Sequence, residues 1–277
     1  MDAIYVSYRQ VESKSLLNKS GLSDYAVNCY TGCAHGCIYC YARFATRFSH
    51  PHEDWGKFVD VKVNAPQVLA REVKRKKAGQ VILSSVCDAW QPIEEKTQLT
   101  RQCLELLLRY RFPVRTLTKN ALAARDLDLM QDNDVHFGVT LTTLDAKLAA
   151  LIEPGASNPQ ERLATLEAAK SKGIKTYAFL GPLMPFLSDT DENITALLKA
   201  VKETGVGYFY MDKLNLRYGV WPALLKFLQK HYPDLIPKYR KIFFDDIAKD
   251  AYISGLSSST RKIVSKLGMD DKMQMGI

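Results

Sequence analysis

Four cysteines lie close together near the N-terminus, and this segment has more capacity for chemistry than any other in the sequence. They are Cys29, Cys33, Cys37 and Cys40. Thiolates at this spacing can surround only a small object, and iron–sulfur clusters are held by Cys thiolates from short loops of this kind. Gly32 and Gly36 give the loop the backbone freedom to turn its thiols inward. If three cysteines ligate a four-iron cluster, one iron is left open to a small molecule.

A structural zinc site is the main alternative to an iron–sulfur cluster. Zinc favours two pairs of Cys or His residues that close a tetrahedron around the ion. The sequence has no second cysteine pair of comparable spacing downstream, although His35 is available as a ligand within the segment. The spacing therefore favours an iron–sulfur cluster over zinc.

The composition indicates a soluble, packed protein. Of its 277 residues, 47% are hydrophobic and 25% are charged, which is ordinary for a globular domain. The segment from Met1 to Gly21 lacks the apolar stretch of a signal peptide, and no run is long enough to span a membrane. We therefore expect a cytoplasmic protein, in which clustered cysteines are more often metal-binding or catalytic than disulfide-bonded.

The formal net charge of +8 would favour binding to polyanions if it were concentrated on one face. The densest basic run, Lys74-Arg75-Lys76-Lys77, closes a predicted helix, where the helix dipole favours cations. A solvated helix end is the favoured interpretation of this run, with a nucleic-acid patch as the alternative.

From Asn64 onward, amphipathic helices alternate with short apolar strands, a pattern typical of βα units with parallel strands. The predicted strands are residues 25–28, 81–83, 114–118, 135–141, 176–180 and 208–211. The predicted helices are residues 64–77, 99–110, 123–130, 160–171 and 192–203, with further helices from 221 onward. Six units are fewer than the eight of a closed barrel, so we expect an α/β fold, a partial open (β/α)6 barrel of the TIM type with a C-terminal helical extension.

The predicted organisation places the polar segments of the barrel at one mouth. We expect an N-terminal extension over residues 1–20, the barrel over 21–217, and a helical extension packed on it over 218–277. Parallel α/β folds bind ligands at the C-terminal ends of their strands. Polar residues follow the predicted strands at 84–88, 118–120, 140–143, 181–182 and 212–215. The cysteine segment follows the first strand and should lie at the same mouth.

The spacing of Cys33, Cys37 and Cys40 resembles the C-x3-C-x2-C signature of the radical S-adenosylmethionine (SAM) superfamily. The resemblance implies that these three residues hold a 4Fe-4S cluster whose open iron is chelated by SAM. It implies that one electron from the reduced cluster cleaves SAM to methionine and a 5′-deoxyadenosyl radical, which abstracts hydrogen from a substrate. Cys29 lies outside the signature and is expected to pack beside the ligands, while Cys103, on a predicted helix, is expected in the core.

The likeness extends over about residues 15–217 and is to the spore photoproduct lyase-like branch, also described as DNA repair photolyase-related proteins. The segments that carry it are residues 25–44, Cys87-Asp88-Ala89-Trp90-Gln91-Pro92-Ile93-Glu94, Thr118-Lys119, Thr142-Thr143 through Glu153-Pro154-Gly155 to Arg162, Gly181-Pro182-Leu183-Met184-Pro185 and Asn215-Leu216-Arg217.

This resemblance implies a set of SAM contacts. Tyr39 should lie beside the adenine, and Ser85 and Cys87 occupy a serine-rich strand end near the methionine part. Lys119 matches a lysine that meets the SAM carboxylate, which suits its charge. Thr142 matches a hydroxyl position near the ribose. The structural alternatives are a core aromatic for Tyr39, a solvated charge for Lys119 and an ordinary strand residue for Thr142.

Three further residues are weaker SAM-binding matches: Asp88, Arg162 and Asn215. For Arg162, the alternative is an ion pair with Glu153.

The sequence departs from spore photoproduct lyases proper at one position. Those enzymes carry a hydrogen-donating cysteine three residues before the aspartate that aligns with Asp88, and here that position is Ser85. Cys87 is the candidate catalytic hydrogen donor instead, with a small buried side chain as its alternative role. The departure places thymine-dimer repair in doubt, but not SAM cleavage.

We therefore expect a radical SAM enzyme with an unidentified substrate. A nucleic-acid lesion is one candidate, and a peptide or small molecule is another. A non-enzymatic iron–sulfur or zinc-binding module is the alternative from a different class. The cluster chemistry implies a reductant such as flavodoxin or ferredoxin as a partner, and no membrane partner is expected.

Overall fold

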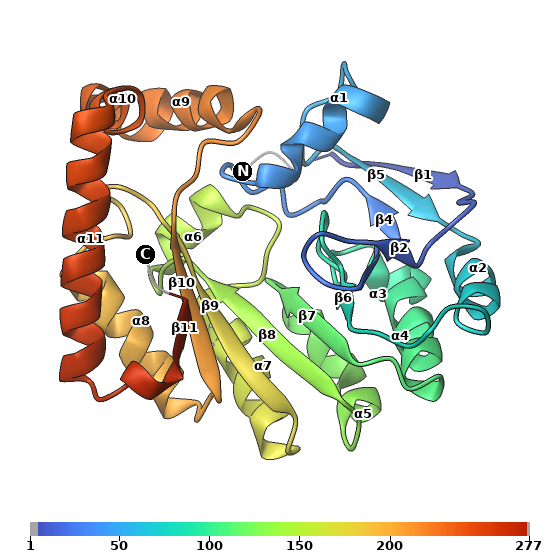
Figure 1. The fold of residues 1–277 in the computed structure, drawn as a ribbon. Helices are drawn as coiled ribbons and strands as arrows, with labels where there is room; N and C mark the ends of the chain where they lie inside the picture. The colour runs from blue at the N-terminus through green and yellow to red at the C-terminus, as the bar shows by residue number, and fades with distance from the viewer. Residues whose placement is uncertain (1–4, 276–277) are drawn as a thin grey trace.

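The computed structural model describes residues 5–275, and its centre is a sheet with the strand order β11-β10-β9-β8-β7-β6-β3-β2 (Figure 1). The short β2 (Asn18–Lys19) is antiparallel to its neighbour, and all the other neighbouring pairs are parallel. The parallel strands are β3 (Tyr25–Val27), β6 (Val81–Leu83), β7 (Val114–Thr118), β8 (Val135–Leu141), β9 (Lys175–Leu183), β10 (Tyr208–Lys213) and β11 (Met273–Met275).

All six predicted strands are present, and they follow one another across the sheet in sequence order. Each apolar run forms a strand because its side chains are buried against the helices that connect the strands. Within residues 5–275 the outer strands β11 and β2 do not pair with each other, so the sheet is open. The prediction of a partial, open α/β barrel is confirmed.

Helices lie between the strands and cover the outer face of the sheet, with α7 and α8 behind it in Figure 1. The α-helices are α1 (Thr46–Ser49), α2 (Ala65–Glu72), α3 (Glu94–Thr97), α4 (Leu99–Arg109), α5 (Leu127–Met130), α6 (Ala146–Ile152), α7 (Pro159–Ser171), α8 (Asp191–Glu203), α9 (Val220–His231), α10 (Ile236–Phe244) and α11 (Asp246–Lys266). Local sequence sets their ends. For example, α7 begins with a capping box between Asn158 and Glu161 and is followed by Gly173 at φ 76°.

Two helices differ from their predicted extent. Residues 123–130 form the end of a 3-10 helix, η2 (Ala121–Asp126), and the single turn of α5. The helix predicted to Lys77 ends at Glu72, and the carboxylate of Glu72 accepts hydrogen bonds from the backbone of Leu16 and Leu17. Lys76 of the basic run donates to Glu72 and to the carbonyl of Leu17, so part of this run binds the N-terminal segment.

Both proposed extensions contribute strands beside the barrel. β1 (Ser7–Val11) pairs with β5 (Phe58–Lys62), and with β4 (Tyr30–Thr31) they form a small second sheet in the order β1-β5-β4. At the other end of the chain, β11 joins the edge of the main sheet, and α11 packs on α8 and α10 (Figure 1). No helix of residues 5–275 is both long and apolar enough to cross a membrane.

Candidate active site

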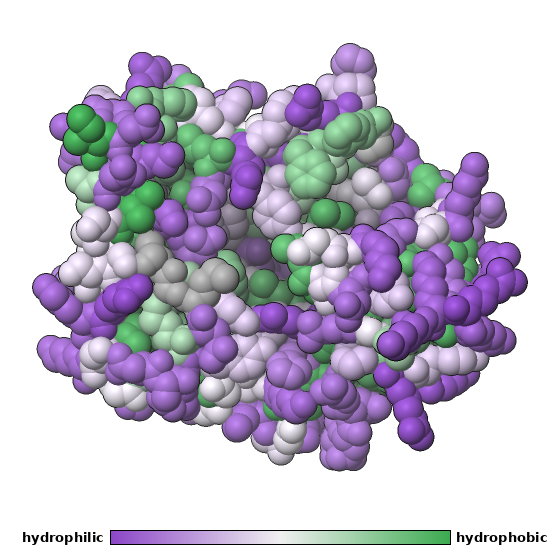
Figure 2. Space-filling view, viewed as in Figure 1, coloured by the Kyte–Doolittle hydropathy of each residue, from purple (hydrophilic) through white to green (hydrophobic). Residues whose placement is uncertain are grey.

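The cysteine segment forms a loop at the C-terminal ends of the strands, between β4 and η1 (Tyr41–Ala45). Two tight turns shape it, in which Gly36 N donates to Cys33 O and Cys40 N donates to Cys37 O, both at 3.2 Å. Through these turns the side chains of Cys33, Cys37 and Cys40 line one cavity, and all three are free thiols. Figure 2 shows the molecule hollowed at its centre, between the C-terminal helices and the N-terminal part. The predicted gathering of these cysteines is therefore present.

The loop requires glycine where it meets the segment before β5. A Cβ atom added to Gly56 would lie 2.7 Å from the Cα atom of Gly36, closer than atoms can pack. Gly36 itself has φ 60° and Gly56 has φ 94°, conformations that favour glycine. The two glycines thus hold the turn between Cys33 and Cys37 against the body of the protein.

The electrostatics of the three thiols favour a cationic occupant. Burial raises the pKa of Cys33, Cys37 and Cys40, that of Cys37 to about 12, and the charge of Asp88 raises that of Cys33 further. Three buried thiolates repel one another unless a metal centre compensates their charge, and metal coordination deprotonates such thiols. In residues 5–275, no three His, Cys, Asp or Glu side chains converge on a point that could hold a single ion. The three thiols nevertheless line one cavity.

Asn28 holds the loop after β6 beside the cysteines. Its Oδ1 atom accepts hydrogen bonds from Ser85 N (2.9 Å) and Val86 N (3.1 Å), and its Nδ2 donates to Ser85 Oγ (3.2 Å). These three hydrogen bonds hold the loop so that Ser85 and Cys87 line the same cavity as the cysteines. The sequence reasoning missed the role of Asn28, although a polar residue ending an apolar strand was a signal for it.

Cys87 is a protonated thiol within this cavity. Burial raises its pKa to about 12, and its Sγ atom lies 3.5 Å from Tyr30 O, to which it can donate. Because the S–H group keeps its hydrogen at neutral pH, the geometry is compatible with a hydrogen-atom donor.

Asp88 ties the ends of β6 and β7 together. Its carboxylate accepts hydrogen bonds from Trp90 N (3.0 Å), Thr118 Oγ1 (2.7 Å) and Lys119 N (2.8 Å). The imidazole Nδ1 of buried His35 lies 3.4 Å from the same carboxylate, and burial lowers the pKa of His35. Asp88 therefore fixes the backbone of Lys119 at the cavity wall.

Lys119 brings positive charge to the cavity. Burial alone would lower the pKa of its ammonium, but the negative charges of Cys37 and Glu153 outweigh this effect and raise the pKa. The Nζ atom lies 5.8 Å from the centre of the Tyr39 ring, a cation–π distance. Lys119 is thus a protonated, partly exposed cation beside the three thiols.

A buried ion pair lies behind the cavity. Arg162 NH2 is 2.5 Å from Glu153 Oε2, and its other nitrogens donate to the carbonyls of Ser157 and Thr140. Tyr39 OH donates to the other oxygen of Glu153, which Thr142 also approaches at 3.2 Å. The structure therefore has the ion pair between Arg162 and Glu153 that the sequence analysis gave as the alternative to SAM binding by Arg162.

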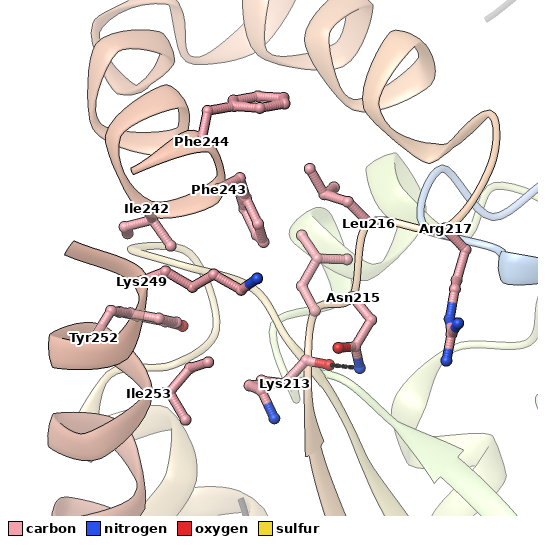
Figure 3. A pocket seen from close by; sticks show the side chains of 11 residues that line it. Lys213, Asn215, Leu216, Arg217, Ile242, Phe243, Phe244, Lys249, Tyr252 and Ile253 are labelled. Carbon is pink, nitrogen blue, oxygen red and sulfur yellow. Dashed lines mark hydrogen bonds between the residues drawn. The ribbon is translucent and has the colours of Figure 1, made fainter. Parts of the chain in front are cut away.

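The predicted SAM contacts divide into three groups by position. Ser85, Asp88 and Lys119 line the cysteine cavity. Tyr39, Thr142 and Arg162 are not part of its lining and belong to the buried network around Glu153. Asn215 is exposed and lines a different cavity beyond β10, where its amide donates to Asp212 and to the carbonyl of Lys213 (Figure 3). Thr140, one of the polar residues predicted at the strand ends, also lines the cavity, as do Tyr41 and Trp55, which the sequence reasoning did not single out.

The family model of the Radical SAM superfamily matches residues 27–201, which is more than half of the chain. The protein belongs to the radical SAM superfamily. The matched segment begins at the last residue of β3 and includes the cysteine loop and every strand end around the cavity up to β9. The family prediction made from the cysteine spacing is thereby confirmed.

Relatives of this radical SAM protein occur in several kinds of organism. It is 30% identical over 228 residues to an uncharacterized protein of Methanocaldococcus jannaschii, covering 81% of this chain and 83% of the relative. It is 23% identical over 246 residues to the radical SAM Nalpha-GlyT isomerase of Pseudomonas phage M6, covering 86% of this chain but 50% of that protein.

Among solved structures, spore photoproduct lyase has the same fold. Its complex with dinucleoside spore photoproduct aligns with a TM-score of 0.70 at 16% identity, covering 97% of this chain and 81% of the other. A double mutant of the lyase with bound AdoMet and the same dinucleoside also aligns with a TM-score of 0.70 at 16% identity, covering 96% of this chain and 80% of that one.

Glu153→Gln is expected to destabilise the protein. The change leaves the guanidinium of Arg162 buried without a counter-charge, and breaking such a pair costs about 3–5 kcal/mol. The positive charges of Arg162 and Lys119 outweigh burial and lower the pKa of Glu153, so its contribution to stability is present above the usual glutamate pKa and lost as the pH falls through the lowered value. Thermal unfolding of this variant and of Glu167→Gln, an exposed change on α7, measures the effect. Equal melting temperatures for both variants would contradict it.

Proposed function

We propose that this protein is a radical SAM enzyme in which Cys33, Cys37 and Cys40 hold a 4Fe-4S cluster that, with SAM bound, supplies a 5′-deoxyadenosyl radical for hydrogen abstraction. The observation that carries the proposal is that three free thiols, those of Cys33 and Cys37 buried and that of Cys40 half-buried, line a single cavity at the strand ends together with one lysine. Membership in the superfamily supports the same chemistry.

The residues around the cavity have complementary roles in this proposal. The ammonium of Lys119 binds the SAM carboxylate, because it is the cation beside the thiols and its raised pKa keeps it protonated. Ser85, held by Asn28, contributes a hydroxyl at the same wall. Buried Trp55, with its Nε1 lacking a hydrogen-bond partner in the described structure, closes the side of the cavity and limits access of water.

A nucleic-acid lesion is the proposed substrate, ahead of a peptide or a small molecule. The fold is shared with spore photoproduct lyase, whose structures contain dinucleoside spore photoproduct. The net charge of +8 would add to the attraction for a polyanion where it is concentrated on one face. A reductant such as flavodoxin or ferredoxin would deliver the electron.

The proposal is tested by anaerobic reconstitution with iron and sulfide, reduction with dithionite in the presence of SAM, and chromatography for 5′-deoxyadenosine. We expect cluster formation and 5′-deoxyadenosine. A protein that binds iron but neither binds nor cleaves SAM would instead be a non-enzymatic iron–sulfur module, and one that takes up only zinc would contradict the cluster.

Cys87→Ala is expected to retain iron and SAM binding but to lose hydrogen transfer from the thiol. In D2O the exchangeable S–H becomes S–D, and in the absence of substrate we expect mass spectrometry to find deuterium in the 5′-deoxyadenosine of the wild type. The Cys87→Ala variant should lose this label. Cys103→Ala, which removes a buried thiol on α4 away from the cavity, should keep it. If the deuterium label is unchanged in Cys87→Ala, Cys87 is not the hydrogen donor and has only a packing role.

A further inference from the structure

A second cavity of about 370 Å³ lies between the end of β10 and the helices α10 and α11 (Figure 3). Its lining includes the cations Lys213, Arg217 and Lys249 and the aromatic side chains Phe243 and Tyr252, and no acidic residue. In Figure 3, Lys249 extends from α11 across the cavity, and Phe243 points down into it from α10. The cavity therefore combines positive charge with flat apolar surface.

The two lysines of this cavity are available to an anionic ligand. Within residues 5–275, no carboxylate lies within ion-pair distance of the ammonium groups of Lys213 and Lys249. Two carboxylates stand nearby, but each already accepts a hydrogen bond from a lining residue: Asp212 from Asn215 Nδ2 at 3.2 Å and Asp189 from Tyr252 OH at 2.9 Å. These carboxylates keep their charge but lie outside the lining, which itself holds three cations and no acidic residue.

The cavity adjoins the cysteine loop through one short segment. Arg217 lies on the connection from β10 to α9, and Figure 3 shows it on the side of the cavity opposite α11, with its side chain pointing downward in the view. Two residues later, a Cβ on Gly219 would lie 3.3 Å from the Cβ of Arg43, whose guanidinium donates to Cys37 O at 3.1 Å. The Arg217 end of this cavity is therefore linked to the cysteine loop through the packing of Gly219 against Arg43.

We propose that this second cavity binds single-stranded nucleic acid, with a backbone phosphate at Lys213 and Lys249 and a neighbouring base against Phe243. Cationic grooves that track the phosphates, with aromatic side chains on which bases stack, are the features that bind single strands. A peptide of acidic residues would match the charge but leave the aromatic surface unused. The inference rests on the proposed function, and it specifies where the substrate strand is held outside the catalytic cavity.

The test is fluorescence anisotropy of a labelled single-stranded oligonucleotide with the reconstituted protein over a range of salt concentrations. Lys213→Gln/Lys249→Gln removes the contact with this phosphate and should bind more weakly, with the slope of log Kd against log salt reduced by about 0.7, the contribution of one phosphate contact on a single strand. Phe243→Leu should weaken binding without changing the slope, because it removes a ring face and no charge. The matched control is Arg261→Gln/Lys262→Gln, which removes two exposed charges from α11 several turns from the cavity.

Weaker binding by the cavity variants, with binding by the control unchanged, would support the inference. A wild type that does not bind the oligonucleotide, a control that loses as much affinity as the cavity variant, or displacement by poly-glutamate as effective as by unlabelled oligonucleotide would each overturn the inference. The last result would instead assign the surface to acidic proteins. Formation of 5′-deoxyadenosine without oligonucleotide, measured on the same preparations, should be equal in the wild type and all variants, so failure of this inference is distinguishable from failure of the proposed function.

Discussion

Cys37→Ala is expected to abolish 5′-deoxyadenosine formation and to reduce the iron content of the reconstituted protein. Cys37 is buried and is one of the three thiols that share the cavity, and alanine has no atom that can ligate iron. The remaining thiols, Cys33 and Cys40, cannot complete a three-thiolate site. Iron and sulfide analysis, the absorption of the cluster and chromatography of the SAM products measure the three parts of the effect.

Cys103→Ala is the matched control for this loss. Cys103 is equally buried, but it lies on α4 in the main core and outside the cavity, so its removal should leave iron content and product unchanged. If Cys37→Ala kept its cluster and its product, the assignment of the ligands would be wrong, and Cys29 would be the next residue to change.

Lys119→Gln is expected to weaken SAM binding while leaving the cluster in place. A hydrogen bond to a charged group contributes about 1.5–3 kcal/mol, which corresponds to about a tenfold to hundredfold rise in the Kd for SAM. Equilibrium binding of SAM to the anaerobically reconstituted protein, together with its iron content, measures this. The raised pKa of Lys119 keeps the ammonium protonated at neutral pH, so wild-type affinity should fall only as the pH rises through this raised pKa.

Two observations separate a binding role for Lys119 from a structural one. Glu153 keeps its partner Arg162 when Lys119 is neutralised, so the melting temperature should change little. Lys175→Gln, at the opposite end of the sheet, removes an exposed lysine paired with Asp134 and should leave SAM affinity unchanged. Equal SAM affinity in Lys119→Gln and the wild type would show that Lys119 is only a solvated charge.

Much of the fold could be predicted because its determinants are local. Apolar runs such as Val114–Thr118 and Val135–Leu141 form strands because burying them stabilises the sheet wherever they lie in it. The connecting helix α7 carries its own start signal in the capping box of Asn158. Short strands such as β5 were missed, because the pairing of β5 with β1 and β4 depends on partners distant in the sequence.

In the candidate site, too, some features follow from the local sequence and others only from the tertiary structure. The spacing of Cys33, Cys37 and Cys40 determined the cluster proposal by itself, because a short loop can bring its own thiols together without help from the rest of the chain. Only the tertiary structure decided three features of the site. Asn28 forms a hydrogen bond with Ser85, Arg162 forms an ion pair with Glu153, and Asn215 lines a separate cavity. Each of these depends on side chains distant in the sequence meeting at strand ends, and such contacts follow from the packing of the sheet rather than from any local pattern of residues.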